Sequence, residues 1–302
     1  MSDFNGVLKR VIDTPAQSPI DIVRRDTLKE LSDHAKRNVI AYYSGFLTAA
    51  DNPAVAISDS DMNGLMTVVK GLNKSSGLDL IIQSPGGDVA ATEALGNYLR
   101  NIFNLDIRVF VPQLAMSGGT MIACIGKEII MGKHSSIGPI DPQLNGIPAY
   151  NIIRQFEEAK TDISKNPSSI PYWQIMLSKF NPTFIYQSYR AVELSSEVLK
   201  DWLENGNMID RSDKDRKAKI NKIVNYLNNN KHTKLHARHI NSEKAKSIGL
   251  KIADLEDDNT LQDKVLSVHH AYMITLQNTN AVKIIENHNG VSYILSADSQ
   301  RK

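Results

Sequence analysis

Continuous apolar, β-prone segments alternate with amphipathic segments in the first half of the chain. The apolar runs are short and bounded by polar or turn residues, as is typical of strands buried on both faces. They cover residues 39–43, 78–82, 107–111 and 128–131. Helical spacing of apolar residues predicts helices between or before them, at 28–37, 58–72, 89–102 and 117–125. Strands that alternate with helices in this way predict an α/β domain with parallel strand pairing.

The second half of the chain is predominantly helical in its pattern. Amphipathic spacing predicts helices at 152–164, 172–202, 214–227, 242–248 and 261–276. Asn181-Pro182 is expected to divide the second of these into two helices. Residues 282–295 predict a β-hairpin, because Asn289-Gly290 is a favoured tight-turn pair and both arms are β-prone.

Composition and charge exclude several classes of protein. The 302 residues are 41% hydrophobic and 23% charged, a balance that excludes a disordered or low-complexity chain. A net charge of +2 argues against nucleic acid as the main partner, since phosphate binding needs a concentrated basic face. No secretory leader and no run of about 18 apolar residues is seen, so we expect a cytoplasmic protein without a membrane span. The single cysteine, Cys124, lies in an apolar segment and is interpreted as a core residue.

Two glycine-rich turns follow successive predicted strands, where α/β folds usually place their sites. Ser84-Pro85-Gly86-Gly87 ends the strand at 78–82, and Met116-Ser117-Gly118-Gly119 opens a helix. Adjacent glycines leave backbone N–H groups unobstructed, and such amides can hold an oxyanion. A serine at a helix start has its hydroxyl beside free amide donors. Either turn alone is ordinarily structural, but together they predict a hydrolase site.

Three ordered motifs resemble the Clp-fold serine proteinases. They are LIIQSPGGD at 80–88, AMSGGTMIA at 115–123 and SIGPIDPQ at 136–143, followed by a distal stretch at 236–250. The nearest branch is the serine dehydrogenase proteinase family, which is related to the signal peptide peptidases. The resemblance implies a Clp/crotonase-like spiral of ββα units, here with additional C-terminal helices and the terminal β-hairpin. It also implies peptide hydrolysis through an acyl-enzyme.

The resemblance assigns site residues by position. Ser117 matches the nucleophile, and Gly87 and Gly118 match the oxyanion-hole amides, with Gly86 shaping that turn. Clp proteases have a histidine where this chain has Asp141, so the sequence departs from their Ser-His-Asp pattern. We interpret Asp141 as a turn residue before a proline, although it could orient a base.

The identity of the general base is therefore open. Signal peptide peptidases use a lysine downstream of the serine, and Lys160 resembles that lysine, which would give a Ser-Lys dyad. A lysine acts as a base only when neutral, so it needs an apolar setting. Neighbouring isoleucines could provide one, but Glu157 and Glu158 could equally hold a charged, solvent-facing lysine. The alternatives are His134, Lys165 or no base at all.

Three histidines near residue 236 have the spacing of a possible metal site. His232, His236 and His239 have spacing that would suit a metal on a helix. They follow a polar asparagine run, however, and two of them fall within the distal motif, so a structural role is favoured. We expect neither a metal nor a cofactor.

The sequence thus predicts a serine peptidase that acts on a peptide or protein substrate. The rival interpretations are a catalytically inactive scaffold or peptide-binding protein and a crotonase-type acyl-CoA enzyme. The resemblance also implies a ring-like homo-oligomer. The sequence does not indicate whether an ATPase partner exists. We divide the chain into an N-terminal arm (1–24), a catalytic domain (25–256) and a possible oligomerisation element (257–302). In the alternative, the terminal hairpin packs on the helix at 261–276 of its own chain.

Overall fold

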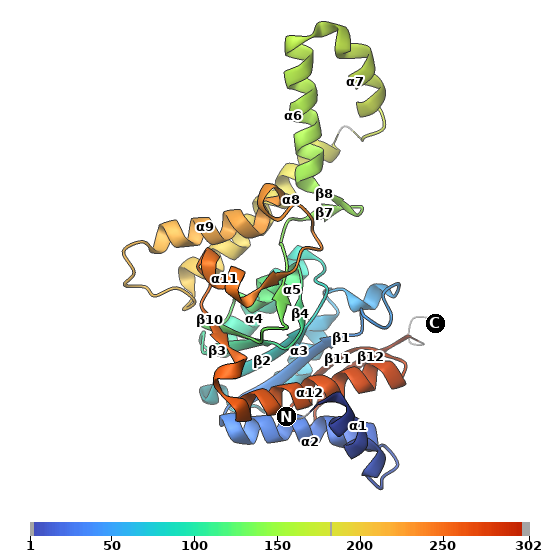
Figure 1. The fold of residues 1–302 in the computed structure, drawn as a ribbon, viewed down its shortest axis with the longest axis vertical. Helices are drawn as coiled ribbons and strands as arrows, with labels where there is room; N and C mark the ends of the chain where they lie inside the picture. The colour runs from blue at the N-terminus through green and yellow to red at the C-terminus, as the bar shows by residue number, and fades with distance from the viewer. Residues whose placement is uncertain (1–2, 182, 298–302) are drawn as a thin grey trace.

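A seven-stranded sheet forms the centre of the molecule (Figure 1). The computed structural model describes residues 3–181 and 183–297. The strand order is β10-β5-β3-β2-β1-β11-β12, in which the strands from β10 to β1 pair in parallel and the last two pair antiparallel. Their bounds are β1 (Asn38–Ser44), β2 (Leu78–Gln83), β3 (Ile107–Val111), β5 (Glu128–Met131), β10 (Ile252–Asp254), β11 (Ala281–Asn287) and β12 (Ser292–Ser296).

Helices cover both faces of this sheet, which explains why its strands are continuously apolar. In β1, Ile40 and Tyr42 belong to the core under one helical layer, whereas Val39, Ala41 and Tyr43 belong to the core under the other. The first layer contains α3 (Asp61–Val69), α4 (Val89–Ile102) and α5 (Gly118–Ala123), and the second contains α2 (Pro19–Ala35) and α12 (Asn259–Asn278). Helix α1 (Phe4–Asp13) packs against α2 and α12.

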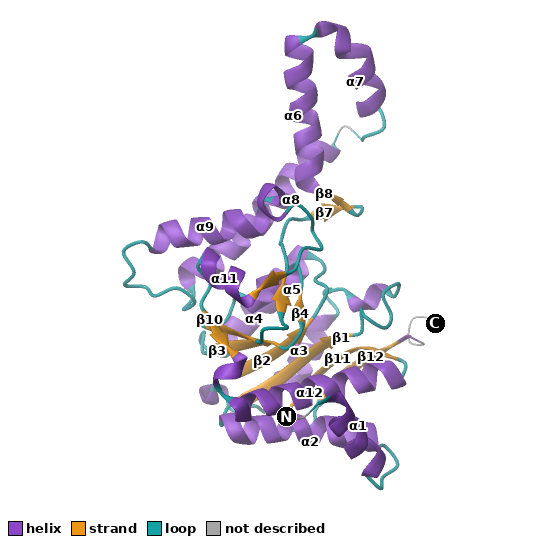
Figure 2. Ribbon diagram, in the orientation of Figure 1, coloured by secondary structure: helices purple, strands orange, loops and turns teal. Residues whose placement is uncertain are grey.

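Smaller elements lie at the carboxyl ends of the parallel strands (Figure 1). A three-stranded sheet has the order β4-β6-β9, and β7 and β8 form a separate pair. Helices α6 and α7 form an arm that projects from the body, and α8 returns toward it (Figure 2). The bounds are β4 (Leu114–Ala115), β6 (Ser136–Ile137), β7 (Gln143–Leu144), β8 (Ile147–Pro148), β9 (Ile240–Asn241), α6 (Ala149–Lys165), α7 (Ile170–Leu177), α8 (Phe184–Asn205), α9 (Arg216–Asn228), α10 (Asn230–Thr233) and α11 (Ser242–Ile248). Short 3-10 helices are η1 (Pro53–Val55), η2 (Lys74–Ser76), η3 (Pro167–Ser169) and η4 (Leu255–Asp257).

The predicted fold class, an α/β protein with a parallel sheet, is confirmed. The predicted strands and helices are present, and α4 has the bounds expected from its spacing. Helix α1 is not among the predicted helices, and its apolar face, with Val7 and Val11 buried, spans only ten residues. The chain is helical on both sides of residue 181, and Pro182 itself lies outside the described residues. Cys124 is buried as expected, and that burial raises the pKa of its thiol to about 12.

The predicted boundaries at residues 24/25 and 256/257 do not match breaks in the structure. Helix α2 crosses the first boundary, and β11, beyond the second, pairs with β1 in the central sheet. The terminal hairpin is covered by its own chain, since Ile284 packs in the core under α12 and Ile285 in the core under α3. Among the described residues, no helix combines the length and apolar character needed to cross a membrane.

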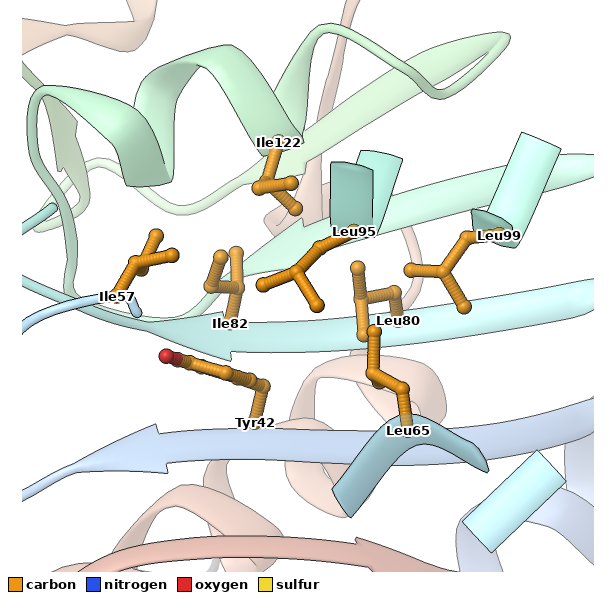
Figure 3. A pocket seen from close by; sticks show the side chains of 8 residues that line it. All are labelled: Tyr42, Ile57, Leu65, Leu80, Ile82, Leu95, Leu99 and Ile122. Atoms are coloured by element: carbon orange, nitrogen blue, oxygen red, sulfur yellow. The ribbon is translucent and has the colours of Figure 1, made fainter. Parts of the chain in front are cut away.

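A small apolar void lies between the sheet and the layer of α3, α4 and α5 (Figure 3). Its volume is about 10 Å³, which is at most the space of one water molecule, and its lining offers no partner for one. The lining side chains are Tyr42, Ile57, Leu65, Leu80, Ile82, Leu95, Leu99 and Ile122. This part of the core is therefore close-packed and poorly able to absorb a further loss of volume.

Leu95→Ala should lower the free energy of unfolding by about 2–5 kcal/mol, because it enlarges this void and removes buried methyl groups. Urea denaturation followed by circular dichroism measures the change. The matched control is Leu47→Ala at a side chain that is 48% exposed, where a change within about 0.5 kcal/mol is expected. Equal midpoints for the two variants would contradict the packing described here.

Candidate active site

The two glycine-rich turns lie side by side at the carboxyl ends of β2 and β4. Backbone hydrogen bonds join them directly. The N–H of Ser84 donates to the carbonyl of Leu114 at 3.0 Å, and the N–H of Met116 donates to the carbonyl of Ser84 at 2.9 Å. The chain order strand–turn–helix thus brings Gly86 and Ser117 into contact although they lie far apart in sequence.

Ser117 has a strained backbone immediately before α5. Its φ is 50° and its ψ is −117°, a conformation that non-glycine residues rarely adopt. Strain of this kind costs of order 1–3 kcal/mol and persists only where surrounding contacts determine it. The Ser117 side chain lines a cleft. A strained, cleft-facing serine is the arrangement expected of a nucleophile at a sharp turn.

Gly86 is required by the close approach of the two turns. Its φ is 95°, and a β-carbon at this position would lie 2.6 Å from Cβ of Ser117. The N–H of Gly86 donates to Oγ of Ser84 at 3.1 Å, so it is already paired. Gly86 therefore shapes the turn, and its own N–H is not free to bind a further oxygen.

Gly87 and Gly118 supply two amide groups beside Ser117. A β-carbon on Gly118 would lie 3.4 Å from the backbone nitrogen of Gly87, so the two residues are neighbours in space. Neither N–H is among the backbone donors that find an acceptor within residues 3–181 and 183–297. Both glycines follow the strand ends that form the floor of the cleft. Their amides are therefore available to an oxygen that develops negative charge next to Ser117.

The cleft has a volume of about 540 Å³ and mostly apolar walls. One wall comes from η1 and the residue after it, and another from α8 and β7. This size accommodates a few residues of an extended polypeptide. The apolar lining residues are Val55, Ala56, Pro85, Val89, Ala90, Met121, Ile140, Pro142, Leu144, Ala191 and Leu194.

His236 also lines the cleft, and it is paired with a buried carboxylate. Its Nδ1 lies 3.0 Å from Oδ1 of Asp141, whose side chain has no exposed surface, whereas 26% of the His236 side chain is exposed. A carboxylate can only accept, so Nδ1 carries the proton of the neutral imidazole and Nε2 keeps a free lone pair. Burial, and to a smaller extent the charge of the nearby Asp141, raises the pKa of the Tyr150 phenol.

The loop that carries Asp141 is fixed to the helix that follows Ser117. The N–H of Gly138 donates to Oγ1 of Thr120 at 2.9 Å, and that hydroxyl is within hydrogen-bond distance of the carbonyls of Ala115 and Gly138. The N–H of Ile140 donates to the carbonyl of Leu227 at 2.9 Å. These bonds place the carboxylate at a constant position relative to α5.

The other candidate bases lie away from Ser117 within this chain. Lys160 is exposed on α6, and 1.5 Å per residue puts it roughly 16 Å along the helix from Ala149. His134 is exposed and lies near His269 and His270 of α12, whose pKa values are lowered by burial and, to a smaller extent, by His134. Helix α12 covers the opposite face of the sheet. Lys165 lines a groove of the projecting arm. Lys160 and Ser117 are thus not brought together within one chain, and a lysine base stays a prediction.

The structure brings together two residues that the sequence interprets separately. The sequence favours a structural role for His236 and a turn role for Asp141, with orientation of a base as the alternative, and the structure pairs the two side chains at the cleft. The signal was available only as two separate motifs, SIGPIDPQ and the distal stretch. Of the other histidines in that cluster, His232 stacks on Tyr226 with ring centroids 5.9 Å apart, and His239 is exposed. Across the described part of the chain, no three His, Cys, Asp or Glu side chains gather as a metal site would require.

A family comparison matches residues 7–288 to the ClpP-like SDH-type serine proteinases. The chain belongs to this family. Two uncharacterized proteins of Methanocaldococcus jannaschii are similar to parts of it. One is 32% identical over 148 residues, which is 47% of this chain and 51% of that protein. The other is 34% identical over 100 residues, which is 33% of this chain and 34% of that protein. The chain therefore spans about half, or less, of the length of these relatives.

Gly86→Ala should abolish the reaction of Ser117 with a fluorophosphonate probe, because the added methyl group collides with the serine. The matched control is Gly71→Ala, which has a similar φ of 82° but no atom within 4 Å of the added carbon. The control should lose only about 1 kcal/mol of stability to backbone strain and keep its labelling. In-gel fluorescence of the labelled proteins compares them. Equal labelling of both variants would contradict the close approach of the two turns.

Proposed function

We propose that this ClpP-like SDH-type serine proteinase is an active peptidase that uses Ser117 as nucleophile, His236 as general base and Asp141 as the residue that orients it. The observation that carries the proposal is the His236–Asp141 pair in the same cleft as the strained Ser117. This chain then has the chemical groups of a Ser-His-Asp triad, in the order Ser117, Asp141, His236 along the sequence. Because the histidine does not stand where Clp proteases have theirs, the motifs alone do not reveal the triad. The substrate is a peptide or protein, which fits the apolar cleft.

The proposed reaction has an acylation step and a deacylation step. Oγ of Ser117 attacks the scissile carbonyl carbon, and its proton passes to Nε2 of His236 as the carbon–oxygen bond forms. The carbonyl oxygen becomes an oxyanion that the N–H groups of Gly87 and Gly118 stabilise. His236 then gives the proton to the leaving nitrogen as the carbon–nitrogen bond breaks. In the second step a water molecule gives a proton to the same imidazole and attacks the acyl carbon. The imidazole then returns a proton to Oγ of Ser117 as the acyl–oxygen bond breaks.

The charge on the imidazole explains the role of Asp141. When His236 takes the serine proton it becomes a cation, and the adjacent carboxylate stabilises that cation. Ser117 and His236 share no hydrogen bond within the described residues, and such catalytic bonds commonly tighten only when substrate binds. A lysine base would need burial to lose its proton readily, and Lys160 is exposed. We therefore favour His236 over the Ser-Lys dyad.

Ser117→Ala and His236→Ala should each lower peptidase activity by roughly 10⁴-fold or more, and the double variant should be no worse, because members of a catalytic unit act non-additively. Asp141→Asn should also lower activity strongly. Lys160→Ala is the matched control and should keep wild-type turnover. A fluorogenic peptide assay measures the rates, and circular dichroism checks that each variant is folded.

Three outcomes would contradict the assignment. Wild-type turnover in Ser117→Ala would remove the nucleophile, and full activity in His236→Ala with loss in Lys160→Ala would restore the Ser-Lys dyad. A folded wild-type protein that neither cleaves peptides nor reacts with the fluorophosphonate would favour the inactive scaffold.

We also propose that the protein assembles into a homo-oligomer through its projecting arm. Assembly is what the family resemblance implies, and α7 supports it because none of the residues of this apolar helix is buried in the single chain. Tyr172 and Ile175 are 58% and 67% exposed. A cytoplasmic location, and the absence of a metal or cofactor, stay predictions.

Ile175→Asp should shift the assembly toward monomers, because it puts a charge into the apolar face of α7. Ile12→Asp is the matched control, since Ile12 on α1 is 73% exposed but lies on the body. Multi-angle light scattering gives the mass of each protein. A monomeric wild type would refute assembly, and an unchanged mass in Ile175→Asp would move the interface elsewhere.

A further inference from the structure

A fully buried lysine reaches from the terminal hairpin to the wall of the cleft. Lys283 lies on β11, and its side chain has no exposed surface. Its Nζ donates to the carbonyl of Ala56 at 2.7 Å and to Oδ1 and Oδ2 of Asp61, both at 2.8 Å. Ala56 lines the cleft, whereas Lys283 does not. The lysine therefore acts on the site through the backbone and does not touch a substrate.

Asp61 holds this ammonium in a network of further bonds. Its Oδ2 accepts from the hydroxyl of Tyr42 at 2.7 Å and from the N–H of Ser58 at 3.1 Å. Asp61 is itself fully buried at the start of α3. Burial lowers the pKa of Lys283, and the Asp61 charge opposes that effect. The carboxylate and the lysine thus compensate each other inside the protein.

Each residue from 55 to 58 is fixed by a bond to a different element. The carbonyl of Val55 accepts from Oγ of Ser44 at 2.7 Å, that of Ala56 accepts from Lys283, and Ser58 donates to Asp61. Ile57 forms a parallel bridge with Gly87. In that bridge the N–H of Ile57 donates to the carbonyl of Gly86 at 2.8 Å, and its carbonyl accepts from Asp88 at 3.0 Å.

Gly87 has no freedom to move independently of this segment. A β-carbon on Gly87 would lie 2.3 Å from the backbone nitrogen and oxygen of Ile57, so the two backbones are in direct contact. A displacement of Ile57 is therefore transmitted to the peptide unit between Gly86 and Gly87, because the Gly86 carbonyl of that unit accepts from Ile57 and its other end is the Gly87 N–H. Misplacement of a catalytic group by about 1 Å can cost about 10²-fold in rate.

We propose that Lys283 is a positioning residue, which, held by Asp61 and Tyr42, fixes residues 55–58 so that Ile57 sets the orientation of the Gly87 oxyanion donor. This inference rests on the proposed peptidase function. It assigns a catalytic consequence to the last hairpin of the chain, which lies across β1 from the cleft floor. An oxyanion donor acts in the transition state, so its loss lowers kcat and leaves KM unchanged.

A purely structural role for the ion pair is the competing explanation, and the chain offers a matched control. Arg24 and Glu286 form a second ion pair with no exposed surface, and Glu286 is on the same strand as Lys283. Because side chains alternate along a strand, Glu286 points to the layer of α2 and α12, on the face away from the cleft. Loss of this pair tests what removal of any buried ion pair from β11 does.

The experiment compares Lys283→Met/Asp61→Asn with Arg24→Met/Glu286→Gln. Each double variant removes both charges, so no buried charge is left unpaired, and each amide can still accept from the neighbouring tyrosine. The readouts are kcat and KM per active site titrated with the fluorophosphonate, and hydrogen–deuterium exchange of peptides that cover residues 55–58 and 84–88. We expect kcat to fall by about 10-fold to 100-fold with KM unchanged, and both segments to exchange faster, only in the Lys283 variant.

Several results would overturn the proposal. Unchanged exchange in both segments would show that Lys283 does not fix them, whatever the turnover. Faster exchange with wild-type kcat would show that their position does not matter for the reaction. Equal losses of kcat in the two double variants would reduce the effect to a general one. Failure of the proposed function is distinguishable, since the wild type itself would then neither turn over peptide nor label at Ser117.

Discussion

The contact between two backbone turns that leave no room for side chains determines where chemistry can occur in this molecule. Ser84 and Met116 pair through their backbones, and the glycine at position 86 leaves room for Ser117, whose Cβ would lie 2.6 Å from a β-carbon at that position. The contact exists because Ser84, directly after β2, forms a parallel bridge with Ala115 at the end of β4. With a larger residue at 86, the strained serine would have to move away from the neighbouring amides of Gly87 and Gly118.

Strand β11 carries a buried ion pair on each face of the sheet. Residues of β11 alternate between the two faces of the sheet, so Lys283 reaches the cleft wall while Glu286 binds Arg24 of α2. Buried ion pairs contribute little net stability, because desolvation of both charges offsets their attraction. Here they fix the orientation of the groups around them, since each charge bonds to several partners. The hairpin that ends the described chain is consequently part of the same cooperative structure as the site.

Features encoded by local sequence were predictable, and those that depend on long-range pairing were not. The strand at 78–82 and the turn at Gly86-Gly87 follow from neighbouring residues, because burial on both faces and positive φ leave local signatures. His236 and Asp141 are 95 residues apart, and each has a common local interpretation, as a polar loop residue and as a turn residue. Lys160 has apolar neighbours in sequence, but only the direction of α6 shows that it is solvent-exposed.

The strain at Ser117 shows why the site needs such a rigid surrounding. Its backbone conformation costs of order 1–3 kcal/mol. Three backbone bonds act against relaxation, from Met116 to Ser84, from Gly119 to Met116 and from Met121 to Ser117, with lengths of 2.9, 2.7 and 3.1 Å. At about 1 kcal/mol each, their sum is comparable to the strain. The Ser117 backbone therefore stays in place only while β2, β4 and α5 remain paired, so this serine is positioned by the same bonds that complete the fold.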